Sequence, residues 1–168
     1  MREILFRGKR SDNCEWVEGF LLKECNYATC SWNLGIEYKT DRFGMFAYDV
    51  AEIIPYTVGQ FTGLTANGTK IFEGDIVKCR HRLVKFCLDD IEKTNPRRSY
   101  GKEIVETDSY GFSCFYWRNY VVSFRDGCIR IQNRSDHHEI RENYIYNHKI
   151  EVIGNIHDNP ELLEEDNG

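Results

Sequence analysis

The chain has 168 residues, enough for one domain or for two small domains packed closely together. Its formal net charge of −5 at pH 7 excludes a strong polyanion-binding signature for the molecule as a whole. Four acidic residues lie in the C-terminal stretch ELLEEDNG, so the rest of the chain is almost neutral. No apolar run approaches the ~18 residues of a membrane span, and charges interrupt the first run, so neither a membrane segment nor a signal peptide is predicted.

The seven cysteines predict a reducing compartment. An odd number of cysteines in a chain without an export signal is typical of reduced cytosolic thiols. The pairs Cys25–Cys30 and Cys79–Cys87 lack the short spacing of zinc knuckles, and no Cys–His signature marks a nucleophile. We therefore expect no catalytic residue, no metal and no other cofactor. The alternative is a metal site that joins Cys25 and Cys30 to a distant histidine.

Aromatic and β-branched residues predict a mainly β fold with few short helices, because ten Tyr and ten Phe suit half-buried pleated surfaces. The runs EILFRGK and WVEGFLL flank RSDNCE and predict a first hairpin. IEYKT and MFAYDVAEIIP predict two strands around the turn DRFG. YVVSF and CIRIQ, joined by Asp126-Gly127, predict the clearest hairpin. KIEVIGNI predicts a final strand, and Asn159-Pro160 predicts the start of a short helix.

The stretch GLTANGTKIFEGDIVK is similar to a phosphate-binding loop, because Gly63 and Gly68 have the required spacing. However, its Thr-Lys pair stands in the reverse order, and a phosphate loop needs a helix after it. The residues that follow, IFEGDIV, are poor helix formers. Asn67-Gly68 instead predicts a two-residue hairpin turn with positive φ, and Gly74 predicts a second tight turn or a bulge.

Two polar segments interrupt the strands. The first, with Pro96 and Gly101 inside it, predicts an insertion at about residues 85–118 with a short helical piece near LDDIEK. The second, NRSDHHEIREN, predicts a polar connection in which His137 and His138 are solvated. The alternative for these two histidines is a metal or proton-transfer site with Glu139. The isolated histidines elsewhere are expected to be structural or exposed.

The run YGFSCFYWRNYVVSF is dense in aromatic residues. So many rings exceed what one small core can hold. Core filling is the first expectation for these rings. Contact with another subunit or with stacked bases is the alternative for those left over.

Three blocks of the chain resemble the YopX family of bacteriophage and prophage proteins: REILFRGKRSDNCEWVEG, TVGQFTGLTANGTKIFEGDIVK and IEVIGNIHDNPELL. They occur in the right order and cover about a third of the chain. The resemblance implies a phage-encoded, cytoplasmic protein of the bacterial host, mainly β, with an SH3-like barrel in its second half and no assigned reaction. Cys14 departs from the family pattern, which usually has Gly after Asn, and residues 85–118 match no part of it.

The predicted organisation therefore has three parts. Residues 1–57 form an N-terminal β subdomain that packs with an SH3-like barrel at residues 58–158. The insertion at about residues 85–118 interrupts this barrel. Residues 159–168 form an acidic tail with a short helix.

A basic face is the most useful functional hint. If the strand that begins at Asp75 continues, Lys78, Arg80 and Arg82 share one side by the period of two, and Lys85 lies nearby. Such a face is either a solvated outer surface or suited to an acidic protein or a single nucleic-acid strand. We expect a non-enzymatic protein-interaction module whose partner is a host protein, a phage protein or a second copy. Weak nucleic-acid binding through the basic face is the alternative, and no membrane partner is expected.

Overall fold

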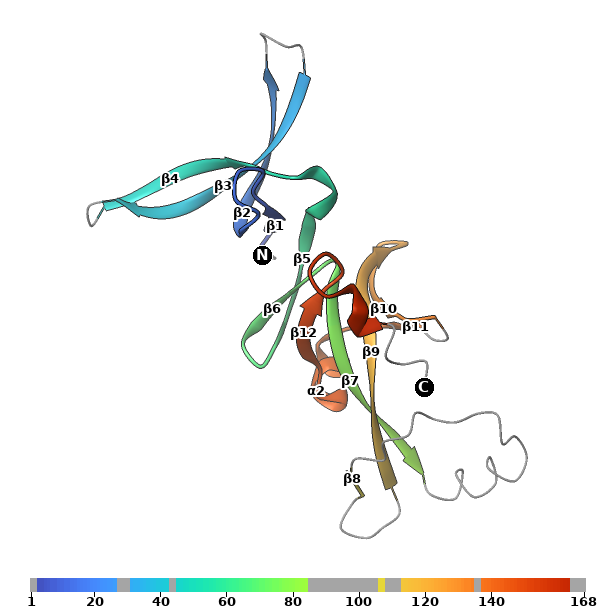
Figure 1. The fold of residues 1–168 in the computed structure, drawn as a ribbon. Coiled ribbons are helices and arrows are strands. Elements are labelled where there is room, and N and C mark those ends of the chain that lie inside the picture. Colours follow the sequence, from blue (N-terminus) through green and yellow to red (C-terminus); the bar gives the residue numbers. More distant parts are fainter. Residues whose placement is uncertain are drawn as a thin grey trace. The chain divides into compact units, whose positions relative to one another are not determined.

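A computed structural model describes residues 3–26, 31–42, 45–84, 106–107, 113–134 and 137–163 (Figure 1). These residues form two antiparallel sheets, each of six strands, which confirms the mainly β prediction. The chain divides into two compact units. Unit 1 contains Met1–Thr65 and Lys70–Glu73, and unit 2 contains Ala66–Thr69 and Gly74–Gly168.

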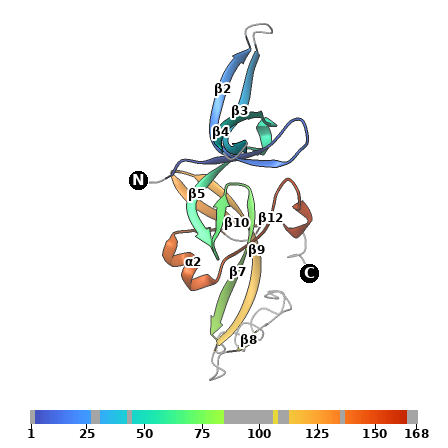
Figure 2. The same cartoon turned by 90° about the vertical axis from the view of Figure 1, so that its left-hand side faces the viewer.

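Unit 1 holds the first sheet, in the order β4-β3-β2-β1-β5-β6, except that Ala66 and Thr69, at the ends of β5 and β6, belong to unit 2. Its elements are β1 (Phe6–Lys9), β2 (Trp16–Asn26), β3 (Ser31–Arg42), β4 (Met45–Glu52), the 3-10 helix η1 (Pro55–Thr57), β5 (Gly59–Ala66) and β6 (Thr69–Phe72). The first predicted hairpin is confirmed, because β1 pairs antiparallel with β2 from Lys9 opposite Trp16. The predicted pairing of IEYKT with MFAYDVAE is confirmed as β3–β4, and Figure 2 shows β2 and β3 as a long hairpin.

Alternation along the strands builds the unit 1 core. Val17, Ile36, Ala51 and Ile53 are buried together. Partly buried apolar side chains from the same unit pack against them: Phe6, Leu21, Leu34, Tyr38 and Val58. These core side chains therefore lie on one face of the β1–β4 sheet, and the side chains between them along each strand point to the other face.

Two left-handed turns explain the stretch that is similar to a phosphate-binding loop. Asn67 and Gly68 have φ values of 50° and 82° and join β5 to β6, so the predicted hairpin turn is confirmed. A strand, not a helix, follows the turn, and the structure therefore lacks the geometry of a phosphate loop here. Gly74, with φ 82°, makes the second predicted turn and leads into β7.

Unit 2 holds the second sheet, in the order β11-β10-β9-β7-β12, and β8 pairs with β9. Its elements are β7 (Asp75–Val84), β8 (Glu106–Thr107), β9 (Ser113–Arg125), β10 (Cys128–Gln132), β11 (His137–Glu139), α2 (Glu142–His148), β12 (Glu151–Asn155) and the 3-10 helix η2 (Pro160–Leu163). The Asp126-Gly127 hairpin and the final strand are confirmed. The short helix begins at Pro160, as predicted.

The predicted polar connection over NRSDHHEIREN was wrong in part. β11 pairs with β10 from His137 opposite Gln132, and α2 begins at Glu142. Both elements depend on tertiary partners that local sequence does not reveal. α2 is a short helix of seven residues, ended by Lys149 in the left-handed region, and its aromatic and β-branched residues are poor helix formers.

Neither sheet closes on itself within the part of the chain that the structure describes. The helical piece expected near LDDIEK and most of the predicted insertion lie outside the described residues. Among the described helices, none is long and apolar enough to cross a membrane.

Candidate functional site

The predicted basic face lies on β7 in unit 2. β7 carries Lys78, Arg80 and Arg82 at alternate positions, as expected for a continuous strand. Arg80 stands directly opposite Trp117 of β9, and the Lys78 Nζ atom lies 5.4 Å from the centroid of the Trp117 ring. The structure thus adds an aromatic ring to the basic face. The side chain of Arg82 and all of Lys85 lie outside the described residues.

Acidic and structural neighbours limit this basic face. β12 places Glu151 directly opposite Lys78, so a carboxylate shares the face with the cation. At the same end, the side-chain amide of Asn119 donates a 2.8 Å hydrogen bond to the carbonyl oxygen of Leu162 in η2. The face is therefore a short basic and aromatic patch centred on Trp117.

A cluster of histidine and tyrosine rings lies on the opposite side of β7. His81 is 8% exposed, and Tyr120 of β9 is fully buried, as core filling predicts for the aromatic run. The Nε2 atom of His81 and the hydroxyl of Tyr120 are 2.9 Å apart, a hydrogen-bond distance. Four rings have centroids between 5.3 and 5.7 Å from that of His81; they belong to Tyr116, Tyr120, His138 and His148.

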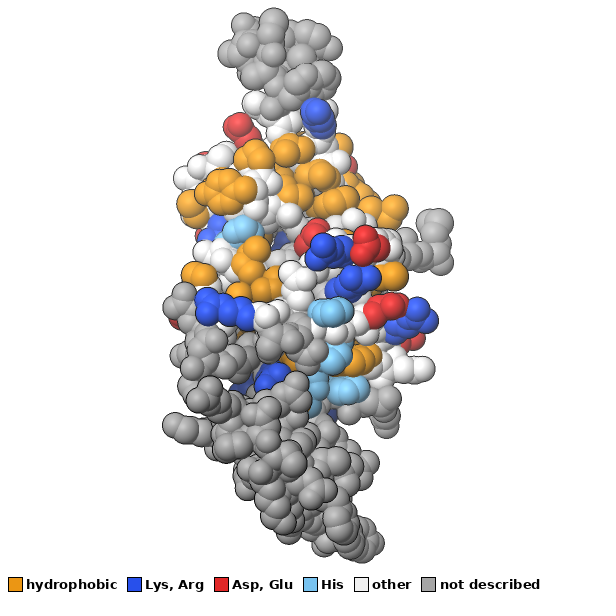
Figure 3. All heavy atoms as spheres, turned by 90° about the vertical axis from the view of Figure 1, so that its right-hand side faces the viewer, with side chains coloured by type: hydrophobic (Ala, Val, Ile, Leu, Met, Phe, Trp, Pro, Cys, Tyr) orange, Lys and Arg blue, Asp and Glu red, His pale blue; other side chains and the backbone are white. Residues whose placement is uncertain are grey.

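Four elements supply these rings. β7 gives His81, β9 gives the two tyrosines, β11 gives His138, and α2 gives Tyr144 and His148. The Tyr144 and His148 rings are stacked, with centroids 3.9 Å apart and 9° between the planes. The Nδ1 atom of His148 donates to the carbonyl oxygen of Tyr144 at 3.0 Å. Figure 3 shows histidine side chains gathered on one face of the molecule, beside charged ones.

The cluster corrects one expectation about the histidines. His138 was predicted to be solvated in a polar loop, but it lies on β11 with its ring packed against His81, Tyr120 and Tyr144. His137, its neighbour on the strand, is exposed, because successive side chains point to opposite faces. Sequence reasoning missed the cluster because its members are far apart in the chain.

The arrangement of the cluster indicates packing instead of metal binding. Its rings meet through their faces and edges, and the nitrogen of His81 is already engaged by Tyr120. Among the described residues, no group of three His, Cys, Asp or Glu side chains is placed to hold a metal ion. The alternative metal site with Cys25 and Cys30 lies on side chains that the structure does not describe.

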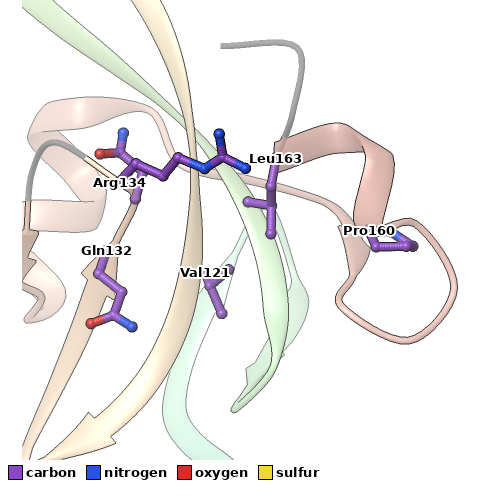
Figure 4. A pocket seen from close by; sticks show the side chains of 6 residues that line it. Val121, Gln132, Arg134, Pro160 and Leu163 are labelled. Carbon is purple, nitrogen blue, oxygen red and sulfur yellow. The ribbon is translucent and has the colours of Figure 1, made fainter. Parts of the chain in front are cut away.

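A hollow of about 400 Å³ opens beside β9, β10 and η2 (Figure 4). Its described lining consists of Val121, Gln132, Asn133, Arg134, Pro160 and Leu163. Arg134 is the one ionisable side chain in this lining, and Figure 4 shows it reaching across toward Leu163. The described part of the lining therefore combines apolar and amide side chains with one guanidinium group.

Unit 1 presents exposed apolar side chains on β4. Phe46, Tyr48 and Val50 are 79%, 63% and 50% exposed, and they alternate along the strand, so they share one face. We call these three residues the β4 stripe. The Nζ atom of Lys39 on β3 lies 3.6 Å from the centroid of the Phe46 ring. The sequence predicted a strand over MFAYDVAEIIP, but it did not place this strand at the edge of the sheet.

Comparison with known proteins identifies a family for this chain. The family model described as YopX protein matches residues 5–164 of the chain. No curated protein and no solved structure matches. The match extends beyond the three blocks that carried the resemblance and spans both units. The chain therefore belongs to the YopX family.

Proposed function

We propose that this chain is a non-enzymatic protein-interaction module, encoded by a phage or prophage and acting in the cytoplasm of the bacterial host. The β4 stripe carries the proposal. Phe46, Tyr48 and Val50 expose at least half of their surface, and contiguous exposed apolar groups mark sites of protein contact. The SH3-like barrel that the resemblance implies for residues 58–158 stays a prediction beside it.

The polar sites of unit 2 support a non-enzymatic role. Among the described residues, the hollow beside η2 has one ionisable side chain in its lining, Arg134, and the rings of the His81 cluster pack against one another. An active site that transfers protons would need groups of different pKa in one cavity. The described lining of the hollow holds no carboxylate or histidine beside Arg134, and in the cluster His81 is already bonded to the buried hydroxyl of Tyr120.

Capture from host cells tests the proposal. Tagged wild-type chain is incubated with lysate of a bacterium that carries the phage genes, and bound proteins are quantified by mass spectrometry, untagged copies of this chain included. We expect proteins that bind the wild type and are lost from Tyr48→Lys, because a charge in the stripe opposes burial. Tyr56→Lys is the matched control, since Tyr56 is also exposed, at 76%, but lies in η1.

The result that contradicts the proposal is equally definite. If no protein, this chain included, distinguishes wild type from Tyr48→Lys, the β4 stripe is not an interaction surface. Reproducible enzymatic turnover by the purified Tyr48→Lys variant would overturn the non-enzymatic role.

A second candidate function is weak binding of single-stranded nucleic acid. Its specific support is Trp117, which lies beside Lys78 and opposite Arg80, since single strands bind where aromatic rings and cations alternate. Fluorescence anisotropy at ~50 mM salt, where phosphate contacts are strongest, tests it with labelled DNA and RNA. Binding that falls in both Trp117→Ala and Lys78→Glu supports this function, and no binding at low salt rules it out.

A further inference from the structure

The β3–β4 hairpin of unit 1 extends beyond the sheet as a two-stranded arm. β3 pairs with β2 over residues 31–37 and with β4 over residues 35–42. Residues 38–42 of β3 therefore pair with β4 alone among the described strands, and Figure 1 shows the arm leaving the β2–β3 hairpin. Two strands by themselves are marginally stable in water, and a third or fourth strand stabilises them.

One hydrogen bond reveals which backbone groups of the arm face outward. The amide of Ile53 donates to the carbonyl oxygen of Leu34 at 3.0 Å, and these two residues come directly after the last β3–β4 pair, in which Gly35 is opposite Glu52. Opposite residues alternate between bonded and non-bonded pairs. Ala51, Asp49 and Ala47 therefore turn their amide groups toward β3, and the residues between them turn theirs away.

The β4 stripe thus combines outward backbone groups with exposed side chains. Phe46, Tyr48 and Val50 direct their amide and carbonyl groups away from β3. Glu52, two residues after Val50, has the same backbone orientation. Its carbonyl oxygen accepts a 2.9 Å hydrogen bond from the amide of Ser11, on the side away from β3. The contact with Ser11 covers that end of the edge, so the part that can accept a strand is residues 46–50.

The two edges of the arm differ in their protection. On the β3 edge, Lys39 and Asp41 carry the outward backbone groups, and charged side chains block edge-to-edge pairing. On the β4 edge, the same positions hold the aromatic and β-branched side chains of the β4 stripe. The β4 edge is therefore the one suited to accept another strand.

We propose that this strand is β4 of a second copy of the chain, paired antiparallel about a two-fold axis at Tyr48. The inference rests on the proposed function and names the partner of the same surface. In this register Tyr48 lies opposite its own equivalent, Phe46 lies opposite Val50 of the second copy, and Ala47 lies opposite Asp49 of the second copy. The outward backbone groups then bond to one another, and two arms of two strands become one four-stranded sheet.

Self-complementarity favours a second copy over an unrelated strand. Aromatic and β-branched side chains opposite each other stabilise a strand pair, and Phe46 with Val50 makes this pair twice around the axis. Asp49, the charged residue between them, lies opposite Ala47, so like charges do not face each other. The contact is isologous and closes after two copies, so it does not extend into a fibre.

The size of the contact sets the expected affinity. Five residues of strand and three side chains per copy bury less than the roughly 800 Å² per partner of stable complexes. We therefore expect a dimer whose dissociation constant is micromolar, and whose population rises with concentration.

Sedimentation equilibrium of the full chain, over roughly 1 to 200 µM to bracket a micromolar constant, tests the pairing. We expect the wild type to change from monomer to dimer, Tyr48→Lys to weaken the dimer at least tenfold, and Tyr56→Lys to behave as the wild type. Circular dichroism checks that both variants fold. A wild type that stays monomeric, or a Tyr48→Lys chain that dimerises as the wild type does, overturns the pairing; partners captured in the lysate experiment would still support the proposed function.

The register has its own test. Photo-oxidation couples neighbouring phenol rings into dityrosine, and the proposed axis brings two Tyr48 rings together. We expect cross-linked dimer in the wild type and in Tyr56→Phe, joined through the peptide that contains Tyr48. Tyr48→Phe retains the ring, so it should dimerise in the centrifuge and lose the cross-link. A cross-link that persists in Tyr48→Phe overturns the two-fold axis at this residue.

Discussion

The hydroxyl of Tyr120 lies 2.9 Å from the Nε2 atom of His81, and both side chains are buried in unit 2. The two residues are on neighbouring strands but not opposite each other, since Tyr116 is the register partner of His81. A buried imidazole must have its polar atoms satisfied, and this hydroxyl does so from the centre of the sheet. The pair therefore fixes the position of the His81 ring, against which β11 packs His138 and α2 packs His148.

Removing this hydroxyl is expected to destabilise the fold. In Tyr120→Phe the ring still fills the core, but the Nε2 atom of His81 loses its partner, which costs about 1–3 kcal/mol. Urea denaturation followed by tryptophan fluorescence measures the free energy of unfolding. Tyr48→Phe is the control, because its side chain is 63% exposed, and it should unfold like the wild type. A Tyr120→Phe chain as stable as this control would show that the bond contributes nothing.

The stacked pair of Tyr144 and His148 is expected to hold α2 in place. A helix of seven residues is too short to be stable by itself, so it depends on side-chain packing. His148→Ala removes an aromatic contact of about 0.5–1.5 kcal/mol, so the α2 amides should exchange with deuterium several-fold faster. Asn143→Ala, an exposed change in the same helix, should leave exchange unchanged or slower. If the α2 amides exchange at the same rate in both variants, the His148 ring does not stabilise the helix.

Local patterns in the sequence predicted the strands and turns of this fold well. Asn67-Gly68 and Asp126-Gly127 specify their hairpins through residues that tolerate positive φ, and the structure has φ values of 50°, 82°, 53° and 76° there. The alternation of Lys78 and Arg80 with Val77 and Cys79 likewise predicted the two faces of β7. These features are encoded within a few residues, so a single sequence reveals them.

Features set by distant contacts could not be predicted. β11 and α2 exist because His138 and His148 pack against His81, more than fifty residues away in the sequence. In the same way, MFAYDVAEIIP predicts a strand but not whether a neighbouring strand covers its edge. The β4 stripe became visible only once the order of the strands was known.

The buried thiol of Cys79 is expected to be unreactive in the folded protein. Burial raises the pKa of Cys79 to about 12, so the reactive thiolate is absent at neutral pH. Cys14 lies at the surface. Short treatment with iodoacetamide at pH 8, followed by peptide mass spectrometry, should label Cys14 first and Cys79 only after urea is added. Labelling of Cys79 as fast as Cys14 would show that β7 opens readily.

The same thiol predicts a loss of stability at high pH. In the unfolded chain a cysteine has a pKa of about 8.5, so between that value and about 12 the folded state retains a proton that the unfolded state releases. The free energy of unfolding should therefore fall as pH rises above about 8.5. Cys79→Ala, which has no thiol to ionise, should lose less stability over the same range. If the free energy of unfolding falls equally with pH in the wild type and in Cys79→Ala, ionisation of Cys79 is not the cause of the loss.

The turn at Gly68 allows backbone strain to be measured without side-chain clashes. Gly68 has φ +82°, and a Cβ atom added there would meet nothing within 4 Å. Gly68→Ala therefore changes only the backbone preference, and the left-handed conformation should cost about 1–2 kcal/mol for an L-residue. Gly68→Asn should cost less, because Asn adopts this conformation more readily than Ala. Urea denaturation of the two variants measures the difference; if Asn is as costly as Ala, the loss comes from a contact and not from the conformation of the hairpin turn.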